Sequence, residues 1–103
     1  MKTFNDLEFK SFGSHEEEHY FMIRGCIMFD NGYGISVVRF KNPYSKGYGS
    51  YTSNENEWEV AVIYGDEKKW DITYNTGIAD DVIGYLSEGE VNWIMIQVQE
   101  LEP

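Results

Sequence analysis

The sequence lacks the residues that an internal disulfide or a membrane-spanning helix would require. It contains one cysteine, Cys26, so an internal disulfide is excluded, and its apolar neighbours indicate a buried free thiol. No apolar run approaches the roughly 20 residues of a membrane-spanning helix. The first residues lack the apolar core of a signal peptide. We therefore expect a cytoplasmic protein with no membrane partner.

Basic residues are also scarce, above all in the second half of the chain. Residues 1–54 are electrically balanced, and the whole net charge of −10 falls in residues 55–103, where Lys68 and Lys69 are the only basic side chains. Such a surface repels nucleic acid and favours a basic partner, such as the nucleic-acid groove of a DNA- or RNA-binding protein. The alternative is that the acidity only maintains solubility. The predicted acidic surface, which would mimic phosphate spacing if it points outward, consists of Glu55, Glu57, Glu59, Asp66, Glu67 and Asp71.

Alternating apolar residues predict about five strands, over residues 7–12, 20–29, 34–41, 58–64 and 70–74. Between the second and third strands, Asn31-Gly32 predicts a type I′ hairpin turn, because both residues tolerate a positive φ. Gly25 interrupts the apolar face of the second strand and predicts a bulge. The third strand is apolar on both faces, which predicts a central, doubly covered position. A second hairpin turns at residues 65–68.

The apolar period changes to that of a helix near residue 78. Asp80-Asp81 opens a predicted short helix that ends at about Leu86. Ser87 and Glu90 form a predicted capping box at the start of a second helix. The core stripe of that second helix consists of Val91, Ile94, Met95, Val98 and Leu101. Residues 1–103 thus predict one small α+β domain, an antiparallel sheet of about five strands in two hairpins with two C-terminal helices packed on one face.

The last predicted helix carries a second apolar face. Trp93 and Ile96 fall to the side of its core stripe. Such a face typically marks an interface, often that of a symmetric dimer. We therefore predict a homodimer through these two residues.

Two acidic motifs raise the question of a metal site. Residues 15–19 read HEEEH and match the zinc-peptidase signature H-E-x-x-H, which requires a helix with His15 and His19 one turn apart. The preceding Gly-Ser and the following alternation favour a turn before a strand instead. Asp80-Asp81 could bind Mg²⁺ with Asp71 or Glu90, but the start of a helix explains both aspartates. We expect no catalytic residue, no metal and no cofactor, and thus a protein that is not an enzyme.

The long connection over residues 42–57 is rich in Gly, Ser, Asn and Tyr. Tyrosines on such a backbone are typical of recognition loops. The predicted partner-binding loop consists of Tyr44, Lys46, Tyr48 and Tyr51. The alternatives are a hairpin connection without a binding role, or a pocket for a nucleotide signal lined by Tyr44, Lys46 and Tyr48.

Several blocks of the chain resemble one family. Residues 31–39 (NGYGISVVR), 58–62 (WEVAV), 74–86 (YNTGIADDVIGYL) and 90–91 (EV) resemble small tailed-phage and prophage proteins whose sequences run NGYGxSVV, YELAV, YDTPITDDVIGYL and EEV in this order. The chain departs from this pattern at Asn75 and Gly77, where the pattern has aspartate and proline, and the last helix has Trp93 and Ile96 where polar residues are expected. The resemblance implies a phage protein that acts in the cytoplasm of a bacterial host, and it implies no activity.

These observations lead to hypotheses of different classes. The first is a phage-encoded acidic protein that binds a basic surface of a host factor and inhibits it. The host factor would be a defence protein or a nucleic-acid-handling protein. The second is a sponge for a nucleotide signal. A minor virion or assembly protein, and a small nuclease or peptidase based on HEEEH or Asp80-Asp81, are the remaining alternatives.

Overall fold

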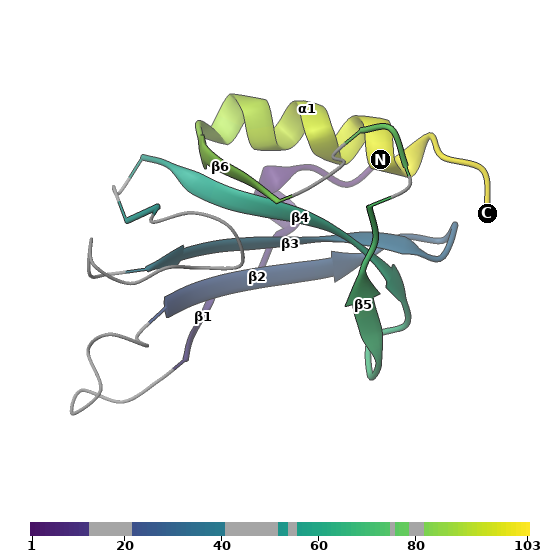
Figure 1. The fold of residues 1–103 in the computed structure, drawn as a ribbon, viewed down its shortest axis with the longest axis horizontal. Helices are drawn as coiled ribbons and strands as arrows, with labels where there is room; N and C mark the ends of the chain where they lie inside the picture. Colours follow the sequence, from purple (N-terminus) through teal and green to yellow (C-terminus); the bar gives the residue numbers. More distant parts are fainter. Residues whose placement is uncertain (13–21, 41–51, 54–55, 75, 79–81) are drawn as a thin grey trace.

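The computed structural model describes residues 1–12, 22–40, 52–53, 56–74, 76–78 and 82–103. In this described part, a six-stranded antiparallel sheet is covered on one face by a single α-helix (Figure 1). The elements are the 3-10 helix η1 (Phe4–Asp6), the strands β1 (Lys10–Phe12), β2 (Met22–Met28), β3 (Tyr33–Phe40), β4 (Trp58–Gly65), β5 (Trp70–Ile72) and β6 (Ile83–Leu86), and the helix α1 (Glu88–Gln99).

The sheet has the order β1-β2-β3-β4-β5, and β6 also pairs with β4. The outer edge of β4 is shared, because its first residues pair with β6 and its last residues pair with β5. Strand β3 lies between β2 and β4. Its Ile35 and Val37 are buried on the helix side and Val38 is buried on the opposite side, which confirms the predicted central strand.

Helix α1 packs its apolar stripe on this sheet. Val91, Ile94, Met95 and Val98 are buried against Ile35, Val37, Val60 and Val62, as the helical spacing predicts. The predicted capping box is confirmed: the Ser87 hydroxyl accepts from the Glu90 N–H at 3.2 Å, and the Ser87 N–H donates to the Glu90 carboxylate at 3.1 Å. The helix therefore begins where the sequence indicates.

The N-terminal segment covers the same face beside α1. The ring of Phe9 stacks on Trp58, with 4.5 Å between the centroids, and Phe4 lies 5.6 Å from Phe9. Gly25 lies beneath this cluster, since a Cβ there would come within 3.1 Å of the Phe9 ring. The predicted bulge at Gly25 is wrong, because β2 pairs with β3 without interruption from Met22 to Met28. The glycine makes room for Phe9 instead.

The prediction of two C-terminal helices is wrong. Residues Ile83–Leu86, expected to end a short helix, form β6 on the open edge of β4. A helix of about seven residues is too short to be stable by itself, and Gly84 weakens it further. Pairing with β4 satisfies the same backbone groups in a strand. Asp80 and Asp81 lie outside the described residues.

The turn at Asn31-Gly32 joins β2 and β3 as predicted, but it is not of type I′. The Phe29 N–H donates to the Tyr33 carbonyl at 2.7 Å, and the Gly32 N–H donates to the Phe29 carbonyl at 3.2 Å. Gly32 has a φ of +85°, whereas Asn31 does not have a positive φ. This is a three-residue loop in which a type I turn is followed by a left-handed glycine.

The side chain of Asn31 fastens this turn to the C-terminal end of α1. Its amide nitrogen donates to the carbonyls of Val98 and Leu101, each at 2.9 Å. Its amide oxygen accepts from the Tyr33 N–H at 3.1 Å. The Val98 carbonyl also accepts from the Leu101 N–H at 3.2 Å, so Asn31 adds a second donor there and supplies a donor to the Leu101 carbonyl just after the helix.

We predict that Asn31→Ala lowers the free energy of unfolding by about 1–3 kcal/mol, because the hydrogen bonds from Asn31 to the Val98 and Leu101 carbonyls are lost. Asn31→Asp should be at least as harmful, since a carboxylate cannot donate and repels the negative end of the helix. Urea unfolding measures both changes. A loss below about 0.5 kcal/mol for both variants would contradict the role given to Asn31.

Candidate functional site

Three side chains form a row across neighbouring strands. Tyr33 of β3 lies opposite Tyr64 of β4, and Tyr64 lies opposite Asp71 of β5. Directly opposed residues in antiparallel strands place their side chains on the same face. Tyr64 follows Val60 and Val62 at a period of two, so the row lies on the face that carries α1.

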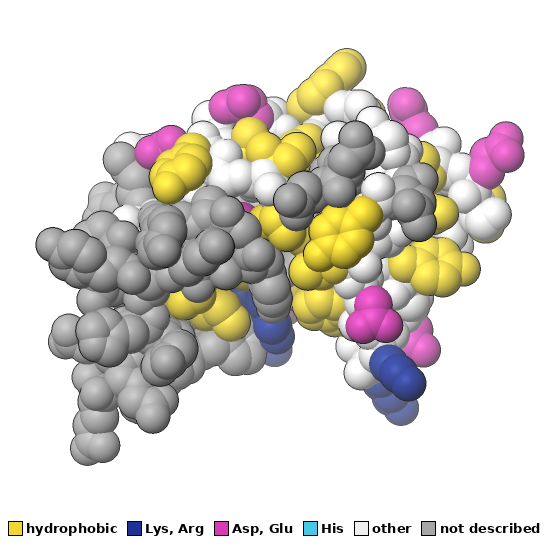
Figure 2. All heavy atoms as spheres, in the orientation of Figure 1, with side chains coloured by type: hydrophobic (Ala, Val, Ile, Leu, Met, Phe, Trp, Pro, Cys, Tyr) yellow, Lys and Arg dark blue, Asp and Glu magenta, His cyan; other side chains and the backbone are white. Residues whose placement is uncertain are grey.

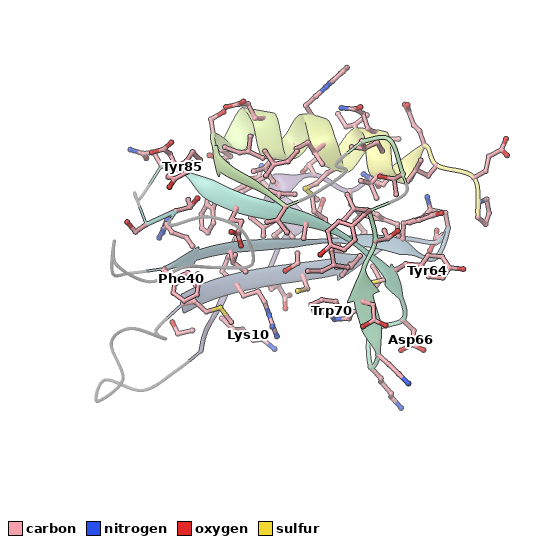
Figure 3. All side chains as sticks on the ribbon, in the orientation of Figure 1. Lys10, Phe40, Tyr64, Asp66, Trp70 and Tyr85 are labelled. Carbon is pink, nitrogen blue, oxygen red and sulfur yellow. The ribbon has the colours of Figure 1, made fainter. Side chains whose placement is uncertain are left out.

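This row lines a groove of about 410 Å³, together with Ile72, Thr73 and Tyr74. The rings of Tyr33 and Tyr64 meet edge to face, with 5.0 Å between centroids and 62° between planes. Tyr64 is 54% exposed and Tyr74 is 49% exposed. Figure 3 places Tyr64 at the end of the sheet opposite Tyr85. We call this site the tyrosine groove.

The groove depends on the two turns beside it. The Gly65 N–H donates to the Gly32 carbonyl at 3.0 Å, which joins the turn after β2 to the end of β4. Gly32 provides the positive φ of this turn, and the Tyr64 ring packs against it, 3.5 Å from where a Cβ would stand. Asn31 holds the same turn from the side of α1. The positions of Tyr33 and Tyr64 are thus fixed by backbone contacts.

The residues of the predicted acidic surface differ in their exposure. Asp66, Glu67 and Asp71 are exposed on the β4–β5 hairpin, whereas Glu57 is half-buried. Glu59 is 1% exposed, so its predicted outward position is wrong. The Glu59 side chain lies on the sheet face opposite α1, together with that of Val38, the residue it pairs with on β3. Val38 is also buried. Glu55 lies outside the described residues.

Asp66 also has a structural role. Its carboxylate accepts from the N–H groups of Lys68 and Lys69 at 2.8 and 2.9 Å, which forms the turn of the hairpin. Figure 2 shows acidic side chains at several separate places on the coloured part of this face, and basic ones at the tip of the hairpin. The acids that are coloured in this view therefore do not form one continuous stripe.

Several predicted site residues are not described. Tyr44, Lys46, Tyr48, Tyr51 and the HEEEH segment all lie outside the described residues. On α1, Trp93 is 63% exposed and Ile96 is half-buried, as the second apolar face requires. In the part of the chain that the structure describes, no group of three His, Cys, Asp or Glu side chains could hold a metal ion. No helix among these residues is long and apolar enough to cross a membrane.

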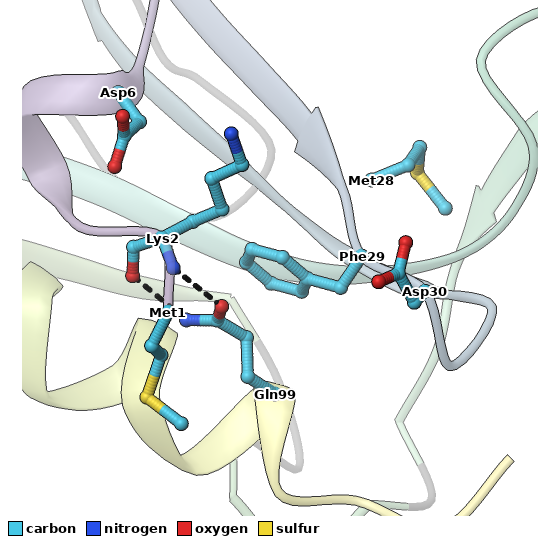
Figure 4. Close-up of a pocket in the computed structure, with 7 residues that line it drawn as sticks. All are labelled: Met1, Lys2, Asp6, Met28, Phe29, Asp30 and Gln99. Atoms are coloured by element: carbon cyan, nitrogen blue, oxygen red, sulfur yellow. Dashed lines mark hydrogen bonds between the residues drawn. The ribbon is translucent and has the colours of Figure 1, made fainter.

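A second hollow lies where the N-terminal segment meets the end of α1, next to Phe29 and Asp30 (Figure 4). At its edge the Lys2 backbone exchanges two hydrogen bonds with the Gln99 amide, at 2.7 and 2.8 Å. The Thr3 N–H donates to the Asp6 carboxylate at 2.8 Å and holds the pKa of that carboxyl below its ordinary value. These contacts fasten the N-terminal segment to α1, so this hollow is structural.

A third hollow lies on the sheet face opposite α1. It is lined by Cys26, Trp70 and Lys10 among others. The guanidinium of Arg24 lies 5.8 Å from the centroid of the Trp70 ring, and Figure 3 shows Trp70 beneath the sheet. Cys26 is half-buried rather than buried, which corrects the expectation for this thiol.

The sequence did not reveal the tyrosine groove, although all of its residues except Tyr33, which precedes the third predicted strand, were assigned to strands. The alternation placed Tyr64 and Asp71 in one hairpin, but their juxtaposition depends on the register of β3, β4 and β5. The signal was the short loop at Asn31-Gly32, which puts Tyr33 at the start of the next strand. A register derived from that loop could have found the row.

Comparisons with protein-family models, with curated proteins and with solved structures give no match to this chain. The resemblance to phage proteins therefore stays a prediction. The functional argument rests on the geometry of the described residues.

We predict that Gly32→Ala shifts the NMR signals of the Tyr64 ring and lowers stability by about 1–2 kcal/mol, because a left-handed backbone is strained by a Cβ. Gly77→Ala is the matched control, since Gly77 has a φ of +75° and open space around it. It should lower stability similarly and leave the Tyr64 signals unchanged. Unchanged Tyr64 signals in Gly32→Ala would refute the role of this turn in the groove.

Proposed function

We propose that this protein is an acidic interaction protein that binds a basic surface of a partner protein. One observation carries the proposal: exposed tyrosines lie beside an exposed carboxylate, Asp71, at the end of the sheet. Tyrosine combines a large apolar ring with a polar hydroxyl, and it is enriched at protein interfaces. Asp66 and Glu67 add negative charge on the same hairpin, although Glu67 lines the hollow on the sheet face opposite α1.

The charge of the whole chain supports a basic partner. A net charge of −10 attracts positively charged surfaces and speeds their association at low salt. The same charge repels nucleic acid, so direct binding of DNA or RNA is not part of the proposal. The buried position of Glu59 and the scattered acids argue against close mimicry of phosphate spacing.

The proposed host setting rests on the resemblance to phage proteins. We propose that the chain acts in the cytoplasm of a bacterial host, where it inhibits a defence protein or a nucleic-acid-handling protein. The exposed acids and tyrosines support binding rather than catalysis. The alternatives of a nucleotide sponge, which rests on Tyr44, Lys46 and Tyr48, and of a minor virion protein have no support among the described residues.

We predict that the double variant Glu67→Lys/Asp71→Lys loses at least tenfold of its affinity for the host partner, because Asp71 in the groove and Glu67 on the same hairpin change from attractive to repulsive charges. The partner is captured from host lysate, identified by mass spectrometry and then measured as a purified protein. The control, Glu100→Lys/Glu102→Lys, makes the same change in net charge at exposed positions after α1.

This control should keep most of the affinity. Equal losses in both double variants would indicate a general effect of net charge. An unchanged affinity in Glu67→Lys/Asp71→Lys would contradict the proposed surface.

Trp93 supports a second proposal, a homodimer through the outer face of α1. Its ring is 63% exposed, and Ile96 lies one turn further along the helix. Two copies that pair here would remove both side chains from water. We predict that the protein is a dimer in light scattering and that Trp93→Ser makes it a monomer, whereas Tyr74→Ser, at a similarly exposed aromatic residue, does not. A monomer at all concentrations would rule this out.

A further inference from the structure

We infer that the tyrosine groove binds an arginine side chain of the partner. This inference rests on the proposed function and specifies the chemistry of its contact. It is carried by three features of the groove: the arrangement of its rings, the carboxylate beside them and the rigidity of its walls.

The rings offer faces to a cation. Tyr33 and Tyr64 meet at 62°, so their planes form a corner in the groove, and Tyr74 lines the same space. A guanidinium or ammonium group is attracted to the face of an aromatic ring because the face is electronegative. The fold already makes one such contact internally, since the Arg39 guanidinium lies 4.4 Å from the centroid of the Trp58 ring.

The carboxylate of Asp71 stands next to these rings. Asp71 lies directly opposite Tyr64 and is exposed. Within the described part of the chain, its carboxylate makes no hydrogen bond or ion pair. Lys68 and Lys69 sit on the same hairpin, but neither lines the groove. A cation on the rings would therefore find a free counter-charge in Asp71.

Arginine fits this set of groups better than lysine. Its planar guanidinium stacks on aromatic faces and can donate two parallel hydrogen bonds to one carboxylate. Lysine carries a compact, strongly hydrated charge that cannot do both. An anionic ligand such as a nucleotide is disfavoured, because Asp71 and the net charge of −10 repel it. The groove is open, which suits a side chain that enters from a protein surface.

The walls are held in place before binding. Tyr33 starts β3 immediately after the turn that Asn31 fastens to α1, and Tyr64 packs over Gly32 in the same turn. A preformed site loses less conformational entropy when a ligand enters. The two rings therefore need little rearrangement to receive a guanidinium.

The test is an NMR titration of the full chain with acetyl-Gly-Arg-Arg-Gly-amide. The controls are the same peptide with citrulline, which has the shape of arginine without its charge, and with lysine. We expect the arginine peptide to bind most tightly and to shift the signals of Tyr33, Tyr64 and Asp71. Equal binding of the citrulline peptide would overturn the cation contact, and equal binding of the lysine peptide would overturn the assignment to arginine.

Variants of Tyr64 and Asp71 separate the contribution of the aromatic ring to arginine binding from that of the carboxylate. Tyr64→Leu should weaken binding about threefold through loss of the ring, whereas Tyr64→Phe should bind like the wild type. Tyr64→Leu/Asp71→Asn should weaken it about tenfold. Tyr85→Leu, at an exposed tyrosine at the other end of the sheet, should have no effect. Unchanged binding in Tyr64→Leu would overturn the inference.

The failure of this inference can be told apart from failure of the proposed function. If Tyr64→Leu binds the purified partner as well as the wild type and Glu67→Lys/Asp71→Lys does not, the acidic surface stands and the arginine site is wrong. If the peptide behaves as expected and both variants bind the partner normally, the site binds arginine and the proposed partner contact is wrong.

Discussion

The side-chain amide of Asn31 is the contact on which the arrangement of this molecule depends. It joins the turn between β2 and β3 to the end of α1, the only α-helix in the described part of the chain, through carbonyls 67 and 70 positions away. A sheet of this kind needs one covered face, and α1 covers it. Asn31 fixes where the helix ends over that face. The same residue accepts from the Tyr33 N–H, so it also sets the start of β3.

The tyrosine groove follows from this constraint. Once the turn is fixed, the register of β3 with β4 and of β4 with β5 brings Tyr33, Tyr64 and Asp71 into one row. Glycine at position 32 provides the positive φ of the turn against which the Tyr64 ring packs. The end of the sheet thus presents aromatic rings and a carboxylate on rigid backbone, and the charge of the chain directs them toward a basic partner.

Much of the fold was predictable from local patterns. The period-two strands, the capping box at Ser87 and the apolar stripe of α1 are short-range signals, and each is confirmed. Residues 83–86 were predicted as helix, because the local pattern does not show that they pair with the edge of β4, a strand distant in the sequence. Glu59 was placed outside because alternation does not reveal that both faces of β4 are buried. The tyrosine groove was not predicted, because it forms only when β3, β4 and β5 pair in their particular register.

The most direct test of the account is a search for intermolecular NOEs between the arginine peptide and the full chain. The account predicts NOEs from the arginine side-chain methylene protons to the ring protons of Tyr33 and Tyr64, with upfield shifts of those methylene protons over the ring faces. NOEs to Trp93 on α1, or none to the two tyrosines at saturating peptide, would contradict it.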